Sequence, residues 1–62
     1  MINFYNVVDA ATGVDVFGHD FYTAENAARE IRDSNLVGTF DVVVADTKAL
    51  VFTITNRKKV RA

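Results

Sequence analysis

The chain carries one histidine, His19, and it is followed directly by Asp20, with Asp15 close by. A histidine beside a carboxylate serves as a general acid or base only when a nucleophile and a pocket complete the arrangement. His19, Asp15 and Asp20 also do not make up the closed set of ligands that a metal ion needs. We therefore expect local hydrogen bonding here, with no catalytic residue, no metal site, no cofactor and no enzymatic activity.

Other polar motifs are equally weak as indicators of chemistry. The three glycines are spaced like turn residues and do not form a phosphate-binding fingerprint. An acidic face that imitates nucleic acid is a poor interpretation, because eight acidic residues stand against seven basic ones. Asp9 and Asp46 are better explained as turn formers.

The carboxyl end holds four of the seven basic residues: Arg57, Lys58, Lys59 and Arg61. Such a cluster can contact phosphates with salt-sensitive affinity, and Tyr5 and Phe17 could then stack on bases. Nucleic-acid binding through this basic cluster is the alternative to the protein-binding function described below. We favour the interpretation that residues 57–62 form a solvated, frayed tail, which also keeps the edge of the last strand from aggregating.

The length of 62 residues predicts a single domain spanning residues 1–62, with marginal stability. The net charge of −1 gives no general attraction to nucleic acid or to an anionic membrane. The chain has no cysteine, no segment that resembles a signal peptide and no apolar run near the roughly 20 residues of a membrane span. We expect a cytoplasmic protein without a membrane partner.

The first part of the chain predicts a β-hairpin. Ile2–Val8 is rich in aromatic and β-branched residues, as strands are. Asp9–Gly13 predicts a tight turn, in which the aspartate accepts bonds from the following amides and Gly13 takes a positive φ. Val14–Phe17 predicts the second strand.

A helix is predicted within Thr23–Leu36, with Thr23 as its N-cap. Ala24, Ala27, Ala28 and Ile31 recur at helical spacing, and the three alanines should allow close packing on a sheet. At the other end, a left-handed Asn35 would place Leu36 against Ile31, as in a Schellman motif.

Thr39–Ala45 and Ala49–Asn56 predict a second hairpin around a turn at 46–48. The expected fold is α+β, with the order ββαββ and a four-stranded, mainly antiparallel sheet that carries the helix on one face. Strand order is left open. The predicted core consists of Phe4, Val14, Val16, Phe40, Val42, Val44, Leu50, Phe52 and Ile54.

The sheet face away from the helix is then predicted to be unusually apolar. Large exposed apolar patches commonly mark partner surfaces. The alternatives are a tightly coiled sheet whose residues cover one another, or a register displaced by one residue, which would exchange the faces. The predicted partner-binding residues are Tyr5, Val7, Phe17, Val43, Val51 and Thr53.

These observations lead to a non-enzymatic protein-binding module, acting as an inhibitor or adaptor through an open sheet face or a strand edge. Its partner would be another protein or a second copy of the chain. In its short length, its lack of Cys, Pro and Trp, and its start at Met1, the chain resembles the small accessory proteins of bacteriophages. That resemblance implies a protein that binds and modulates a host macromolecule.

Overall fold

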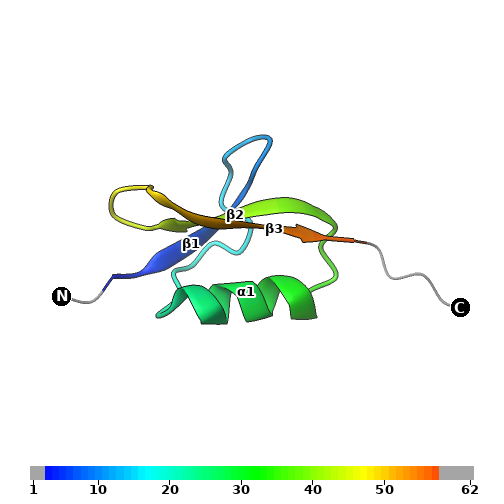
Figure 1. Ribbon diagram of the computed structural model, residues 1–62, viewed down its shortest axis with the longest axis horizontal. Coiled ribbons are helices and arrows are strands. Elements are labelled where there is room, and N and C mark those ends of the chain that lie inside the picture. Colours follow the sequence, from blue (N-terminus) through cyan, green and yellow to red (C-terminus); the bar gives the residue numbers. More distant parts are fainter. Residues whose placement is uncertain (1–2, 58–62) are drawn as a thin grey trace, which may run out of the picture.

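A computed structural model of the chain describes residues 3–57. One helix lies on one face of a three-stranded antiparallel sheet with the strand order β1-β2-β3 (Figure 1). The elements are β1 (Tyr5–Asp9), α1 (Ala24–Asp33), β2 (Gly38–Val44) and β3 (Leu50–Asn56). The α+β class is confirmed, whereas the predicted order ββαββ and the fourth strand are not, because residues 3–57 show the order β-α-β-β with three strands.

The segment predicted as the second strand, Val14–Phe17, is part of the long connection between β1 and α1, residues 10–23, which runs beside β1. It touches β1 through isolated bridges, Val8 with Asp15 and Tyr5 with Phe21. Between these bridges the chain turns away, because the Asp15 carboxylate accepts hydrogen bonds from the amides of Phe17 and Gly18, at 3.1 and 2.9 Å. The connection therefore covers the edge of β1 without continuing as a strand.

The turn after β1 follows the prediction. The Asp9 carboxylate accepts hydrogen bonds from the amides of Ala11 and Thr12, at 2.8 and 3.3 Å. The Gly13 amide donates to the Asp9 carbonyl at 2.7 Å, and Gly13 has a φ of +75°. A left-handed backbone of this kind costs glycine little, since it has no Cβ.

The start and the buried face of α1 are also confirmed. Thr23 is the N-cap, and its hydroxyl accepts a hydrogen bond of 3.0 Å from the Asn26 amide. Ala27, Ala28 and Ile31 are buried. The helix contacts all three strands of the sheet.

The end of α1 differs from the prediction. Among the described residues, Lys48 alone has a positive φ outside glycine, so Asn35 is not left-handed and the Schellman motif is absent. The C-cap is Ser34, whose hydroxyl donates to the Ile31 carbonyl at 2.8 Å. The Asn56 side chain also donates to the Ile31 carbonyl, at 2.9 Å, and to the Leu36 carbonyl. The last residue of β3 thus holds the end of the helix.

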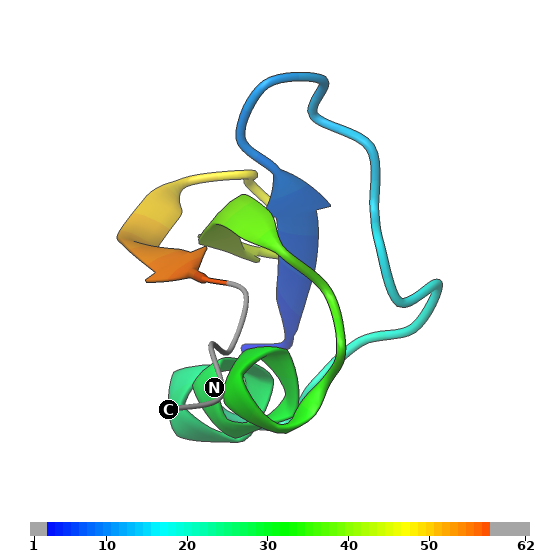
Figure 2. The ribbon, with the colours of Figure 1, turned by 90° about the vertical axis from the view of Figure 1, so that its right-hand side faces the viewer.

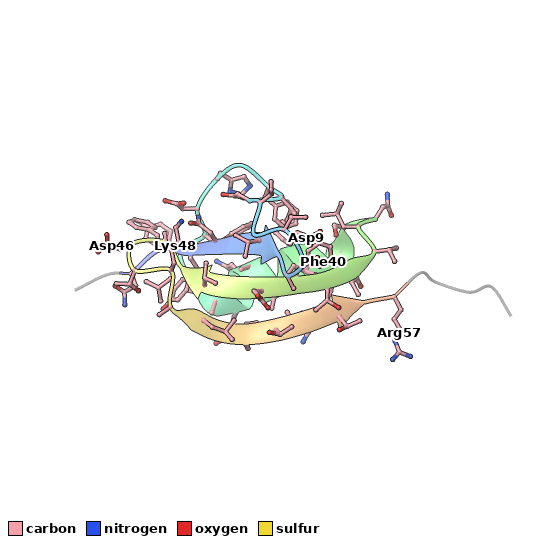
Figure 3. All side chains as sticks on the ribbon, turned by 90° about the horizontal axis from the view of Figure 1, so that it is seen from above. Asp9, Phe40, Asp46, Lys48 and Arg57 are labelled. Atoms are coloured by element: carbon pink, nitrogen blue, oxygen red, sulfur yellow. The ribbon has the colours of Figure 1, made fainter. Side chains whose placement is uncertain are left out.

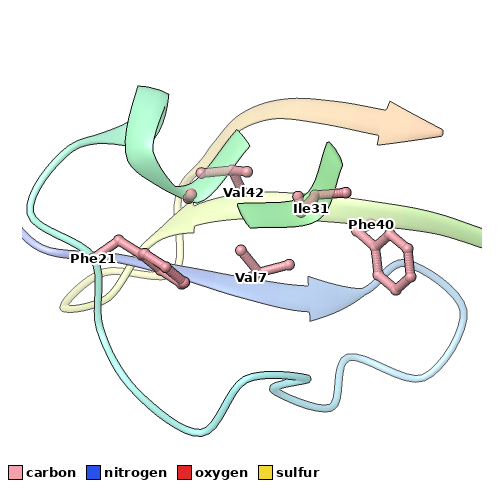
Figure 4. Packing of buried hydrophobic residues seen from close by; sticks show 6 residues of the cluster. Val7, Phe21, Ile31, Phe40 and Val42 are labelled. Atoms are coloured by element: carbon pink, nitrogen blue, oxygen red, sulfur yellow. The ribbon is translucent and has the colours of Figure 1, made fainter. Parts of the chain in front are cut away.

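The core lies between α1 and the sheet (Figure 4). Its buried members are Val7, Phe21, Ala27, Ile31, Phe40 and Val42. Partly buried side chains packed against them are Tyr5, Val16, Phe17, Ala24, Phe52 and Ile54. The predicted core positions Val16, Phe40, Val42, Phe52 and Ile54 are therefore confirmed.

Three other predicted core positions are wrong. Phe4 is 44% exposed and Leu50 is 61% exposed, and Val14 is also exposed. In β1 the error is one of register, because Val7 pairs directly with Val42 and directly paired side chains share a face. Val7 therefore points toward the helix. Val44 is half-buried.

Candidate functional site at the free edge of the sheet

The six residues predicted for partner binding do not share one exposed surface. Val7 is fully buried in the core, and Tyr5 and Phe17 pack against that core. Their assignment to the sheet face away from the helix is therefore wrong. For Tyr5 and Val7 the prediction failed because the strand faces the helix with the opposite set of alternate residues. For Phe17 it failed because the turn at Asp15 takes the residue out of strand geometry.

The three remaining predicted residues differ among themselves. Val43 is 7% exposed, whereas Val51 and Thr53 are exposed. The Thr53 hydroxyl donates to the Asp41 carboxylate at 2.7 Å. The hydroxyls of Thr39 and Thr55 lie 3.2 Å apart in the same pair of strands. This face is more polar than predicted, since threonines and Asp41 occupy much of it.

A buried asparagine joins two polar residues from distant parts of the chain. Asn6 is 5% exposed, and its amide nitrogen donates to the Asp20 carboxylate. Its carbonyl oxygen accepts from the Lys48 ammonium at 3.2 Å. Lys48 has a φ of +64°, which costs a side-chain-bearing residue free energy. Asn6 thus fixes the long connection and the β2–β3 turn, a structural role that uses both of its polar atoms.

The two edges of the sheet differ. The edge of β1 is covered by the connection, since Tyr5 and Phe21 exchange backbone hydrogen bonds of 2.8 and 2.9 Å and the Val16 amide donates to the Val7 carbonyl at 3.0 Å. No segment within residues 3–57 pairs with the outer edge of β3. Figure 2 shows this contrast, with the connection beside β1 and β3 at the opposite side.

The hydrogen bonds of β2 identify which groups of β3 point outward. The Ala10 amide donates to the Thr39 carbonyl, so Thr39 and every second residue of β2 after it direct their backbone hydrogen bonds toward β1. Phe40 and Val42 then bond to β3, through their partners Ile54 and Phe52. Bonding direction alternates along a strand. The backbone N–H and C=O groups of Thr53 and Thr55 therefore face away from the sheet.

The beginning of β3 is irregular. Val42 pairs with Phe52 and Val43 pairs with Leu50, so a bulge leaves Val51 as the extra residue. Val51 is 42% exposed. The regular part of the free edge runs over residues 52–56, and we call it the β3 edge.

A groove between α1 and β3 lies beside the β3 edge and has a volume of about 710 Å³. Its charged side chains are two acidic and two basic ones, so the groove carries no net charge. Phe52 and Ile54 form its apolar floor, half-buried against the core. The groove is lined by Glu25, Ala28, Arg29, Arg32, Asp33, Phe52, Thr53 and Ile54.

The residues considered for acid–base chemistry have local partners. His19 is exposed, its Nδ1 lies 3.1 Å from the Asp20 carbonyl, and its ring lies 4.6 Å from that of Phe21. Asp15 caps a turn and Asp20 binds Asn6. Over residues 3–57, no group of three or more histidine, aspartate and glutamate side chains could hold a metal ion.

The basic cluster is described only at its first residue. Arg57 is exposed directly after β3, while Lys58, Lys59 and Arg61 lie outside the described residues. The predicted frayed tail over 57–62 lies outside them too, apart from Arg57. The alternative nucleic-acid site therefore stays a prediction.

Comparisons with protein-family models, curated proteins and solved structures gave no match for this chain. In the part of the chain that the structure describes, no helix has the length and apolar character to cross a membrane. The β3 edge could not be located from the sequence, because the strand order was open. One indication was present, since residues 50–56 contain neither a charged residue nor a proline.

Proposed function

We propose that this chain is a small, non-enzymatic protein-binding module that receives an extended segment of a partner at the β3 edge. Its role would be that of an inhibitor or adaptor. Strand addition gives affinity through main-chain hydrogen bonds, and alternate side chains give specificity. The partner strand would bond to Thr53 and Thr55 and would cover the half-buried Phe52 and Ile54.

One observation carries this proposal: the two edges of the sheet are treated differently. Natural proteins protect edge strands with lysine, proline or a covering segment. The connection covers the edge of β1, whereas the β3 edge has no charge, no proline and no cover within residues 3–57. An edge left open beside an apolar-floored groove supports a binding role.

A proline substitution tests the proposal. The Thr53 amide points away from β2, so Thr53→Pro should leave the sheet intact and remove one outward donor. Thr53→Val is the matched control, because it also loses the hydroxyl bond to Asp41 but keeps the amide. Both variants and the parent chain would be immobilised and exposed to a lysate of the source cells. We expect partners retained by the parent and by Thr53→Val and lost from Thr53→Pro; equal capture by all three would refute the proposal.

The alternative function, nucleic-acid binding through Arg57, Lys58, Lys59 and Arg61, has its own test. Removing residues 57–62 should abolish a gel shift at low salt and flatten its salt dependence if these residues contact phosphates. Tight binding by the intact chain that is lost on truncation would favour this alternative over protein binding. A cytoplasmic location belongs to the proposal as well, since a chain without cysteine does not depend on an oxidising compartment.

A further inference from the structure

We propose that the β3 edge binds the β3 edge of a second copy, antiparallel, about a twofold axis beside Ile54. This inference rests on the proposed function, because it names the occupant of the same edge. The three strands of each copy would join into one continuous sheet of six. Both helices would lie on the same face, since the axis runs perpendicular to the sheet.

The number of open edges decides the symmetry. The connection occupies the β1 edge, so within residues 3–57 the β3 edge is the edge available to another strand. Two copies that pair through edges must then use the same edge. Such an isologous contact closes on itself as a dimer and does not propagate into a fibre.

The register follows from the outward backbone groups and the bulge. The sequence Thr53-Ile54-Thr55 is symmetric about Ile54 and lies in the regular part of β3. With the axis at Ile54, the N–H and C=O of each Thr53 exchange hydrogen bonds with those of the other copy's Thr55. A register centred on Thr53 would instead require the bulged Val51 to bond to Thr55, which its irregular backbone disfavours.

The side chains match in this register. Ile54 lies opposite its own symmetry mate on the helix side, which extends the apolar floor of the groove. Thr53 lies opposite Thr55 on the other side, and pairs of β-branched threonines are favourable across strands. No charged side chain of β3 meets another one, because Leu50–Asn56 has none.

The helices leave a gap that their own side chains can occupy. Since α1 contacts all three strands, the two helices would be separated by three strand spacings, or roughly 14 Å. Helices in direct contact lie about 8–10 Å apart. Long side chains such as Arg29 and Arg32 fit the difference, and each wall also presents Glu25 and Asp33 as opposite charges.

The self-complementary sequence Thr53-Ile54-Thr55 favours a second copy over an unrelated strand, and the charges at the two ends of the molecule are compatible with such a pair. Asp46, in the β2–β3 turn, and Arg57, after β3, lie at opposite ends of the sheet (Figure 3). Antiparallel pairing brings the Arg57 end of each copy toward the Asp46 end of the other. The turn also carries Lys48, so its net charge is zero and antiparallel pairing meets no repulsion there, whereas a parallel arrangement would bring the two Arg57 side chains together.

The first experiment measures the molar mass of the full chain by light scattering over a range of concentrations. We expect the mass to rise from 6.9 kDa to twice that value. Thr53→Pro removes an amide that each copy uses, so the dissociation constant should rise at least tenfold. Thr53→Val should stay close to the parent. Circular dichroism of each variant checks that the fold is kept.

The second experiment uses engineered thiols, because the chain has no cysteine of its own. A residue on the axis at a non-hydrogen-bonded pair has its Cα about 4.5 Å from its mate, which suits a disulfide. Ile54→Cys should therefore cross-link with itself on oxidation. Thr55→Cys should not, because its mates lie about 8 Å apart, two residues along and one strand across.

Mixing Thr53→Cys with Thr55→Cys gives a test that does not disturb the core residue Ile54. These exposed positions should form the mixed disulfide and little of either self-linked product. A parent chain that stays monomeric near millimolar concentration, or a dimer that Thr53→Pro leaves unchanged, would overturn this inference. If such a monomer still captures a foreign protein that Thr53→Pro loses, the proposed function stands and only the identity of the occupant is wrong.

Discussion

The contact between Asn56 and the end of α1 gives the sharpest prediction for stability. The Asn56 amide nitrogen donates to the carbonyls of Ile31 and Leu36. Asn56→Ala removes both bonds, each with a net contribution of about 0.5–1.5 kcal/mol. The Ile31 carbonyl keeps its bond from the Ser34 hydroxyl, and the Leu36 carbonyl can turn to water, so we expect a loss of about 1–2 kcal/mol in the free energy of unfolding.

Asn56→Asp separates the hydrogen bonds from the shape of the side chain. A carboxylate has the same outline but no donor, and its charge lies at the negative end of the helix dipole, which adds about 0.3–1 kcal/mol. We therefore expect the Asn56→Asp variant to have a lower free energy of unfolding than the Asn56→Ala variant.

Thermal unfolding followed by circular dichroism, at one fixed protein concentration, measures both variants. For a domain of this size 1 kcal/mol corresponds to about 4–8 °C, so Asn56→Ala should lower the midpoint by about 4–16 °C. Asn35→Ala is the control, because Asn35 is exposed near the same helix end. A midpoint for Asn56→Ala equal to that of this control, or equal stability of Asn56→Asp and Asn56→Ala, would show that the Asn56 side chain does not stabilise the helix end.

Three further predictions concern the helix and the turn. Thr23→Ala removes the N-cap acceptor and should cost about 0.5–2 kcal/mol in urea unfolding, whereas Thr23→Ser should keep most of the stability. Ala27→Leu should overpack the contact with the sheet and cost about 1–3 kcal/mol, while Arg29→Leu on the groove wall should cost much less; equal losses would contradict the packing. Lys48→Ala loses the bond to Asn6 and keeps the left-handed backbone, so Lys48→Gly should be more stable than Lys48→Ala by about 1 kcal/mol. A calorimetric ranking with alanine above glycine would show that the backbone at position 48 is not strained.

Features set by neighbours in the sequence could be predicted. The Asp9–Gly13 turn and the Thr23 N-cap depend on hydrogen bonds that span two to four residues. The burial of Ala27 and Ile31 follows from helical spacing. In each case the groups that decide the structure lie within one or two turns of chain.

Features set by distant contacts could not be predicted. The stretch from Phe4 through β1 has apolar residues on both alternations, Phe4 and Val8 on one and Tyr5 and Val7 on the other, so alternation alone cannot choose a face. The helix end is capped by Asn56, more than twenty residues away, and local signals at Asn35 gave the wrong motif. The free edge required the strand order, which no local pattern specifies.

The strand order also has a consequence for how the chain folds. Val42 lies ten residues from its partner Phe52 but thirty-five residues from its partner Val7, by subtraction of their numbers. The longer loop costs about 1 kcal/mol more to close. We therefore expect the β2–β3 hairpin to form early and β1 to join late.

Until β1 docks, the central strand β2 has an unpaired edge of its own, centred on Val42-Val43-Val44. During that interval the intermediate exposes two unpaired strand edges, one on β2 and one on β3. Several copies can then associate edge to edge into an open-ended aggregate, whereas the native chain would form only a closed dimer. Slow docking of β1 would thus be the step at which chains aggregate, both during synthesis at high local concentration and during refolding of a concentrated sample. The chain between β1 and β2 includes the connection that covers the β1 edge in the native state, and we expect its length to prolong that exposure.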